Sequence, residues 1–229
     1  MTEFEQRFSL LSDKRITEEI QAGNIIIDPF DPKSLGTASY DLRLGRYYYG
    51  HKSDISDAYS IYNPWSEEDV RKYWGEYQTA HKASEFFNKS GIPEGIWPDD
   101  EIIMVFPGEL ILCHTQEFIG YQNVGTSMMK ARSSIGRSGL EICRCAGWGD
   151  VGYINRWTME VANTINRPIP LVAGRRISQL AFFEVGQILD KDYTATGKYQ
   201  TSADIEQIKI TWTPDQMLPK MWKDREVSK

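Results

Sequence analysis

The second half of the chain constrains the fold most, because short β-type segments alternate there with turn signals. Six segments after residue 100 combine apolar patterning with β-branched or aromatic residues, which is typical of strands. They are 101–106, 109–115, 139–145, 158–162, 169–171 and 177–185. Turn signals separate them at 107–108, 147–152, 166–168 and 173–174. Regular short strands with polar turns predict a mainly β fold, in which antiparallel strands form a closed barrel or a sandwich.

The two ends of the chain add a helix and further strands. Residues 12–23 have a helical apolar pattern, with Ser12 as the N-cap and Gly23 as the stop signal. A short strand through 24–32 ends in proline punctuation, and 39–45 alternates like a half-buried strand. Near the other end, 208–212 has the pattern of a last strand. The charged residues 213–229 are expected to be mobile.

Residues 46–100 differ from the rest and are interpreted as an insertion into a single domain of residues 1–229. Within them, 66–89 has a helical pattern with an acidic first turn. The aromatic residues of the insertion are Tyr47, Tyr48, Tyr49, Tyr59, Tyr62, Trp65, Tyr73, Trp74, Tyr77, Phe86, Phe87 and Trp97. Aromatic stripes are more often packing than ligand contacts, so we expect a partly helical insertion that covers the core or a subunit interface.

Composition argues against several classes of function. The net charge is −6, whereas a nonspecific nucleic-acid binder is normally basic. An acidic chain can still hold a small phosphorylated ligand in a local cluster of Arg and Lys. The longest apolar runs are far too short to span a bilayer, and the polar N-terminus has no signal-peptide pattern. We therefore expect a cytoplasmic protein with no nucleic-acid or membrane partner.

The cysteines and histidines give no sign of a disulfide framework or a metal site. The chain has three cysteines, and an odd number argues against a disulfide framework. Cys143 and Cys145 are two positions apart, so on a strand they would share one face. The histidines, His51, His81 and His114, lack ligand spacing. We therefore interpret the cysteines as core residues and expect no metal held by the protein.

A basic, hydroxyl-rich segment at 130–140 is the first candidate for chemistry. Arg132 and Arg137 flank Ser133 and Ser134, with a glycine between the serines and the second arginine. The planar guanidinium fork suits phosphate, and serine hydroxyls with backbone N–H groups complete such a cradle. The same composition is common where a turn caps a surface helix, so the segment alone does not decide between the two.

A glycine-rich segment at 146–163 is the second candidate and has the pattern of a hairpin. Its backbone N–H and C=O groups can meet the edge of a base, and an aromatic side chain can pack on base or sugar. Glu160 lies between Met159 and Val161 on a strand next to the core. Strand alternation can turn this carboxylate to solvent. If it is partly buried instead, it is a candidate general base with a raised pKa.

Together these segments resemble the dCTP deaminase family of the dUTPase superfamily. The resemblance rests on 132–140, 146–150 and 158–160, taken in that order. Thirteen positions separate Arg137 from Asp150 and ten separate Asp150 from Glu160, which is the spacing of the family. Further matches extend it over most of the chain outside the insertion, at 11–16, 27–32, 39–45, 106–110, 173–180, 193 and 198–200.

The resemblance implies a distorted antiparallel β-barrel of the dUTPase-like kind, assembled as a homotrimer with active sites between subunits. It also implies hydrolytic deamination of a deoxycytidine nucleotide, with dCTP as the expected substrate, to the deoxyuridine nucleotide and ammonia. The family uses no catalytic metal, and this chain lacks the His-x-Glu and Pro-Cys-x-x-Cys motifs of the zinc deaminases. Mg²⁺ is expected only through the triphosphate of the nucleotide.

The resemblance also assigns catalytic roles to four residues. Glu160 would take a proton from water and return it to the ring nitrogen or the amine. Ser133 and Arg137 would orient that water and stabilise the tetrahedral intermediate. The backbone of Ala146 would help to hold the water.

Nine further residues are expected to contact the nucleotide. Asp150 would accept a hydrogen bond from the deoxyribose 3′-OH, and Tyr153 would pack beneath the sugar and select against a 2′-OH. The others, with the phosphate contacts first, are Arg132, Ser134, Tyr193, Lys198, Gln200, Thr158 and Met159.

Departures from the family pattern lie around the base, the sugar and the triphosphate. Gly149 replaces a branched apolar residue, Val151 a proline and Asn155 a glycine, and Tyr153 is the aromatic residue that dUTPases prefer. Two other functions therefore stay open. One is a pyrophosphatase, or a bifunctional dUMP-forming deaminase, in which Asp150 activates water. The other is a non-catalytic nucleotide-binding or interaction protein on the same fold.

Overall fold

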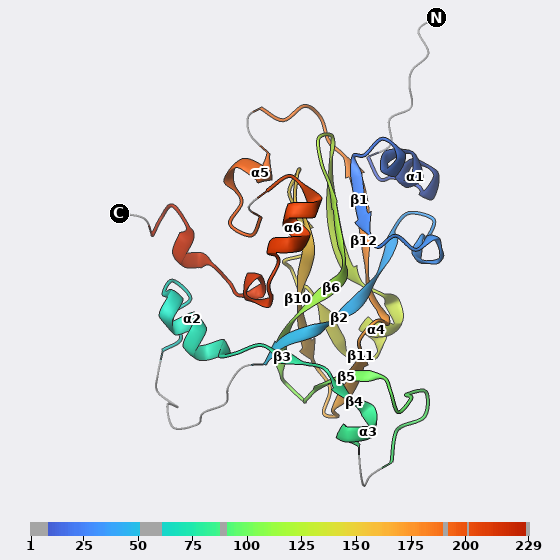
Figure 1. Cartoon of the computed structure of the whole chain (residues 1–229), viewed down its shortest axis with the longest axis vertical. Helices are drawn as coiled ribbons and strands as arrows, with labels where there is room; N and C mark the ends of the chain where they lie inside the picture. The colour runs from blue at the N-terminus through green and yellow to red at the C-terminus, as the bar shows by residue number, and fades with distance from the viewer. Residues whose placement is uncertain (1–8, 51–60, 88–90, 190–191, 201, 228–229) are drawn as a thin grey trace, which may run out of the picture.

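A computed structural model of the chain describes residues 9–50, 61–87, 91–189, 192–200 and 202–227. Antiparallel strands dominate it (Figure 1). The larger sheet runs in the order β8-β10-β6-β2-β12-β7-β9, with β1 added to β6 and β3 to β2. The smaller sheet has the order β11-β5-β4. The strands are β1 (Ile25–Asp28), β2 (Tyr40–Gly50), β3 (Gln78–Thr79), β4 (His81–Lys82), β5 (Glu101–Val105), β6 (Leu110–Tyr121), β7 (Gly125–Ala131), β8 (Leu140–Ile142), β9 (Trp148–Gly149), β10 (Ile154–Asn163), β11 (Ile169–Val172) and β12 (Arg176–Glu184).

The large sheet curls around the hydrophobic core, which confirms the expected mainly β, distorted-barrel fold (Figure 1). Strand β6 lies at its centre, because it pairs with β1, β2 and β10. Most side chains of β6 are buried on both faces, and such a strand loses the alternation that marks a half-exposed one. This explains why the sequence pattern indicates a strand only to residue 115. Beyond it, Glu117 is fully buried, and Arg43 neutralises its carboxylate at 2.6 Å.

The expected N-terminal helix is confirmed as α1 (Asp13–Gln21). The Ser12 hydroxyl accepts a hydrogen bond from the Arg15 N–H at the first turn, and Ile16 is fully buried in the core. Gly23 follows the helix with φ of 76°, a conformation that glycine adopts without strain. Within the described residues, no helix is long and apolar enough to cross a membrane.

The prediction of one helix over 66–89 is wrong. The structure has α2 (Glu67–Trp74) and α3 (Ala83–Phe86), with β3 and β4 between them. Gly75, at φ of 65°, ends α2, and the chain then extends so that β3 pairs with β2 and β4 with β5. The helical pattern depends only on neighbouring residues, whereas the strands with which 78–82 pair, β2 and β5, lie elsewhere in the sequence.

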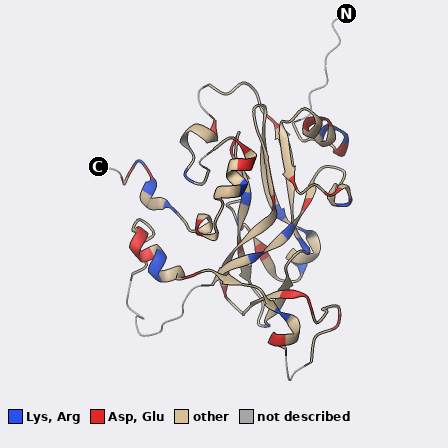
Figure 2. Cartoon of the chain, viewed as in Figure 1, with Lys and Arg blue, Asp and Glu red and all other residues tan. Residues whose placement is uncertain are grey.

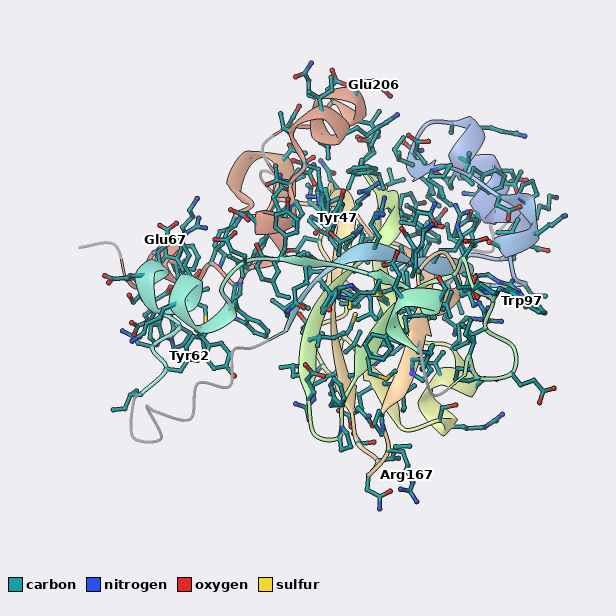
Figure 3. All side chains as sticks on the ribbon, turned by 60° about the horizontal axis from the view of Figure 1, so that its bottom comes forward. Tyr47, Tyr62, Glu67, Trp97, Arg167 and Glu206 are labelled. Carbon is teal, nitrogen blue, oxygen red and sulfur yellow. The ribbon has the colours of Figure 1, made fainter. Side chains whose placement is uncertain are left out.

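The aromatic residues of the insertion divide between core and surface. Tyr48, Tyr49 and Trp74 are buried, and Tyr59 lies outside the described residues. Six others are exposed in the single chain: Tyr62, Trp65, Tyr73, Tyr77, Phe86 and Trp97. Tyr62 and Trp97 lie at opposite sides of the molecule (Figure 3). The insertion covers part of the core through the buried side chains of Val70, Trp74 and Ala83. The exposed rings do not take part in this packing, and their burial at a subunit interface stays a prediction.

The predicted last strand at 208–212 is also wrong, because the region forms α6 (Ile205–Thr211). The Asp204 side chain caps its N-terminus, and Ile205 and Ile208, three positions apart, turn one apolar face to Phe118 and Ile154. Beyond α6 the expected mobile tail contains two 3₁₀ helices, η3 (Pro214–Met217) and η4 (Met221–Lys223). Residues 228–229 lie outside the described part.

Cys143 and Cys145 do not share a strand face. Strand β8 ends at Ile142, and Cys143 and Arg144 follow with φ of 57° and 35°, so the chain turns at that point. Cys143 is buried beside Met129, while Cys145 is exposed. The sequence analysis also missed β7, whose polar and small residues weaken the strand pattern.

Candidate active site

A cavity of about 380 Å³ lies between the 146–153 hairpin, β10 and the segment 193–199. The sequence-predicted residues that line it are Ala146, Asp150, Tyr153, Thr158, Glu160, Tyr193 and Lys198. The other lining residues are Trp148, Gly149, Trp157, Tyr199 and Met217. Seven of the expected site residues therefore meet within one chain, although 52 positions separate Ala146 from Lys198.

The hairpin owes its shape to a tight turn around Asp150. The Tyr153 N–H donates to the Asp150 carbonyl at 3.0 Å, and the Gly152 N–H donates to the Tyr121 carbonyl at 3.0 Å. Gly152 has φ of 90°, which disfavours any residue with a Cβ. The turn leaves the Asp150 carboxylate exposed at the rim of the cavity, where it makes no hydrogen bond with a described residue.

The departure at Gly149 has a steric cause. A Cβ at this position would lie 2.3 Å from the Trp157 ring, so the branched apolar residue of the family pattern does not fit. Trp157 is itself buried, and its indole N–H donates to the Ile119 carbonyl at 2.8 Å. In this chain the Trp157 ring of β10 fills the space beside Gly149.

Three aromatic rings form one side of the cavity. The Tyr153 ring packs edge-on against Trp157 at 5.2 Å and against Tyr193 at 5.0 Å between ring centroids. Burial raises the pKa of both tyrosine hydroxyls, so they stay protonated at neutral pH. The segment that carries Tyr193 is tied to the hairpin, because the Tyr193 N–H donates to the Val151 carbonyl at 2.9 Å. This wall can pack against a sugar or a base.

Glu160 is the carboxylate of the cavity wall. It is half-buried on β10, and Oε2 is buried with no hydrogen-bond partner among the described residues. Burial raises the pKa of this carboxyl above its usual range. Thr158 and Glu160, two positions apart, both face the cavity, while the fully buried Met159 side chain faces the core. Of the two orientations considered for Glu160, the structure has the partly buried one, which faces the cavity.

Lys198 and Gln200 have different surroundings. The Lys198 ammonium lines the cavity and forms an ion pair with Asp224. Gln200 is buried, where its carbonyl accepts from the Ile154 N–H at 2.7 Å and its amide donates to the Gly152 carbonyl at 3.0 Å. Gln200 therefore fastens the segment after α5 (Tyr193–Thr196) to the base of the hairpin.

The arginine–serine motif lies apart from this cavity. Helix α4 (Ser133–Arg137) has no buried residue, and the Ser133 and Arg137 side chains make no hydrogen bond or ion pair with described residues. Ser134 is exposed as well. Arg132 instead pairs with Asp41 at 3.1 Å. One chain thus brings Ala146, Asp150 and Glu160 together at the cavity, but not the Ser133 and Arg137 side chains that are expected to orient the water.

Four cavity residues have no role predicted from the sequence: Trp148, Trp157, Tyr199 and Met217. Trp148 is more than half exposed (58%) beside the cavity, an unusual position for tryptophan in a glycine-rich hairpin. That signal was available in the sequence. Met217 had none, because only the fold brings residue 217 to this site. No cluster of three or more His, Cys, Asp or Glu residues in the described part could hold a metal ion.

Comparison with known proteins gives one consistent result. Residues 10–185 match the family model described as dCTP deaminase-like. A protein of Persephonella marina named "dCTP deaminase, dUMP-forming" is 31% identical over 191 residues, which are 83% of this chain and 91% of that protein. A protein of the same name from a Hydrogenobaculum species is 34% identical over 78% of this chain and 84% of its own length.

A solved structure agrees in fold. The crystal structure of 2′-deoxycytidine 5′-triphosphate deaminase from Agrobacterium tumefaciens superposes with a TM-score of 0.54 over 80% of this chain and 50% of that one. Its sequence identity is 16%, so this likeness concerns the fold alone. With the family model matched from α1 to the end of β12 and relatives above 30% identity along most of the chain, this protein belongs to the dCTP deaminase family.

Proposed function

We propose that the chain hydrolytically deaminates dCTP, with Glu160 as the general base and general acid. One observation carries the proposal: a half-buried carboxylate with a raised pKa and an unpartnered oxygen faces a nucleotide-sized cavity. A structural carboxylate at such depth normally has a partner, as Glu117 has in Arg43. An unpartnered one suits a group that must exchange a proton with substrate and water.

The proposed step adds water to C4 of cytosine and expels ammonia. Glu160 takes a proton from the attacking water and passes it to N3. It then takes the proton of the new C4 hydroxyl and passes it to the leaving amine, so that a carbonyl replaces the amine and the carboxylate is restored. The raised pKa places the carboxyl closer to the operating pH, where proton transfer in both directions is efficient. The backbone at Ala146, on the same wall, supports the water.

The remaining cavity residues fit a deoxynucleotide. Asp150 at the rim would accept from the 3′-OH, and the Tyr153 ring would pack under the sugar and leave no room for a 2′-OH. Lys198 and Tyr193, which also line the cavity, would meet the phosphates. Mg²⁺ would arrive with the triphosphate and neutralise its charge without a protein cage.

The proposal includes a homotrimer in which α4 of a neighbouring copy completes each site. Ser133 and Arg137 are the expected water-orienting residues, yet neither lines the cavity of its own chain. Both side chains are exposed and make no hydrogen bond or ion pair with the described residues, so they are available to a second copy. Closed rings of identical subunits form when one surface meets a different surface of the next copy.

We further propose that the final product is dUMP. The relatives reported above are named dUMP-forming, and in this chain the exposed Asp150 carboxylate makes no hydrogen bond or ion pair with a described residue. It can activate a second water for attack on the α-phosphorus, after which diphosphate leaves. The reaction would then convert dCTP and two waters into dUMP, ammonia and diphosphate.

The test is a product assay with purified protein, dCTP and Mg²⁺, in which dCTP, dUTP, dUMP and dCMP are separated and ammonia is measured. We expect dUMP and ammonia in equal amounts. The appearance of dCMP without ammonia would mean a pyrophosphatase, and an unchanged substrate would favour a non-catalytic binding protein.

A single variant separates the two steps. In Asp150→Asn the amide cannot take a proton from water, so we expect ammonia release to continue while dUTP accumulates in place of dUMP. Glu160→Gln is the matched control, because it should abolish ammonia release instead. Loss of both products together in Asp150→Asn would contradict separate roles for the two carboxylates.

A further inference from the structure

The C-terminal segment, residues 213–227, reaches the mouth of the cavity although it lies outside the part that matches the family model. Met217, at the end of η3, is one of the cavity-lining residues. Asp224, directly after η4, forms the ion pair with Lys198. The Asp224 carboxylate is therefore paired with the same Lys198 ammonium that we propose to bind the phosphates of the nucleotide.

This carboxylate is held by a packed segment. Met217 and Leu218 are 3% and 2% exposed and share an apolar cluster with Val70 and Trp74 of α2. The C-terminal segment and α2 lie side by side (Figure 1), and both carry charged residues (Figure 2). Arg71 of α2 forms an ion pair with Asp215 at 3.3 Å. The Tyr49 hydroxyl donates to Asp215 at 2.8 Å. The insertion thus anchors the segment that presents Asp224.

A second set of contacts fixes the register of this segment beside the lysine. The Lys220 N–H donates to the Tyr199 hydroxyl at 3.0 Å, and the Lys220 ammonium lies 5.1 Å from the centre of the Tyr199 ring. The same ammonium donates to the Lys198 carbonyl at 3.4 Å. Residues 198–199 and 220–224 are therefore joined by polar contacts on both sides of the ion pair.

The ion pair is weak enough to exchange. The two side chains are 31% and 27% exposed, and pairs that reach solvent contribute little stability. A phosphate chain carries more charge than one carboxylate and offers more acceptor oxygens, so it competes well for the same ammonium. The Lys198 ammonium cannot form a close ion pair with the Asp224 carboxylate and with a phosphate group at the same time, so the two compete for it.

We propose that Asp224 is a specificity-determining residue that competes with the phosphate chain of the nucleotide for Lys198. The inference depends on the proposed function for the role of Lys198. It predicts that Asp224 weakens the binding of every ligand whose phosphates reach Lys198 and leaves ligands without phosphate unaffected. The C-terminal segment, which lies beyond the part that matches the family model, then affects the relative affinities of the site for different nucleotides.

The experiment measures binding of inorganic triphosphate by calorimetry, which requires no base and no turnover. We expect Asp224→Asn to bind it roughly 3- to 5-fold more tightly than the unchanged protein, the factor typical of one exposed ion pair. Glu226→Gln is the matched control: it removes the same charge from the same segment, but Glu226 pairs with Arg225 at 2.9 Å and Lys198 acts on it only electrostatically. Its change in affinity should be clearly smaller than that of Asp224→Asn.

A double-mutant cycle assigns the effect to the contact. In a Lys198→Met background, Asp224→Asn should no longer change the affinity. The proposal is overturned if Asp224→Asn has no effect, if Glu226→Gln has an equal one, if the effect persists without Lys198, or if none of the proteins binds inorganic triphosphate. Failure of dCTP deamination with the triphosphate result intact would remove the proposed function and leave the competition standing.

Discussion

Two regions carry the motifs of the family, the cavity wall at 146–160 and helix α4 at 133–137, and they differ in how much of their environment one chain provides. In the wall, Tyr153 and Trp157 pack together and Glu160 is half-buried. In α4 no residue is buried, and Ser133 and Arg137 make no hydrogen bond or ion pair with the described residues. One chain therefore encloses Glu160 in a packed wall, whereas it turns the Ser133 and Arg137 side chains outward.

The largest expected effect concerns the wall. Glu160→Gln keeps the shape of the side chain but cannot accept a proton, so we expect the rate of ammonia release to fall roughly 10²- to 10⁴-fold. Nucleotide affinity should change little. Steady-state kinetics with dCTP and calorimetry with a non-hydrolysable analogue measure the two quantities, and a variant with near-normal turnover would remove Glu160 from the mechanism.

The next effect tests whether α4 serves another copy. We expect Arg137→Ala alone to lose most activity, because the water loses its orienting cation. When the Arg137→Ala and Glu160→Gln proteins are mixed and allowed to exchange subunits, activity should return to roughly one quarter of normal, since each site needs an intact wall from one copy and an intact α4 from the next.

Subunit mixing can also contradict the proposal that α4 of one copy completes the site of another. If both groups act within one chain, the mixture stays as inactive as its two components. A mixture of two Glu160→Gln preparations is the control for recovery caused by the exchange procedure itself.

A smaller expected effect is the change in unfolding free energy when a glycine is replaced in each of the two regions. Gly149→Val in the wall places a side chain against Trp157, so we expect unfolding free energy to fall by roughly 1–3 kcal/mol. Gly136→Ala in α4 meets nothing within 4 Å and should be neutral or slightly stabilising. Chemical denaturation measures both, and a Trp157→Phe background should reduce the penalty at Gly149.

The smallest effect is the pH dependence that Glu160 gives to stability. Its folded-state pKa is raised by burial, so the folded protein holds the proton more tightly than the unfolded chain and loses stability as the pH rises through that window. Glu160→Gln removes this penalty. At pH 7 it should stabilise the protein slightly, and the gain should vanish below the ordinary glutamate pKa. Arg137→Ala should show no such trend in denaturation curves.

Much of the fold and of the site follows from the sequence. The cap at Ser12, the strands around β5, β11 and β12, and the turn at 150–152 depend on neighbouring residues, and local patterns predict them well. Seven of the thirteen expected site residues line one cavity. The predicted secondary structure was wrong where residues distant in the sequence determine it. Residues 78–82 form strands because they pair with β2 and β5. Residues 205–211 form a helix whose apolar face packs against Phe118.

The sequence by itself determined the mainly β architecture and the spacing of its motifs, because strand period, caps and glycine turns are properties of short stretches of chain. Only the tertiary structure decided which way Glu160 faces, since either alternation is possible until one face of β10 is packed. It also decided that α4 lies outside the cavity and that Asp224 meets Lys198, 26 positions away. Such contacts arise from the packing of segments that share no local pattern, and the chemistry of the site depends on them.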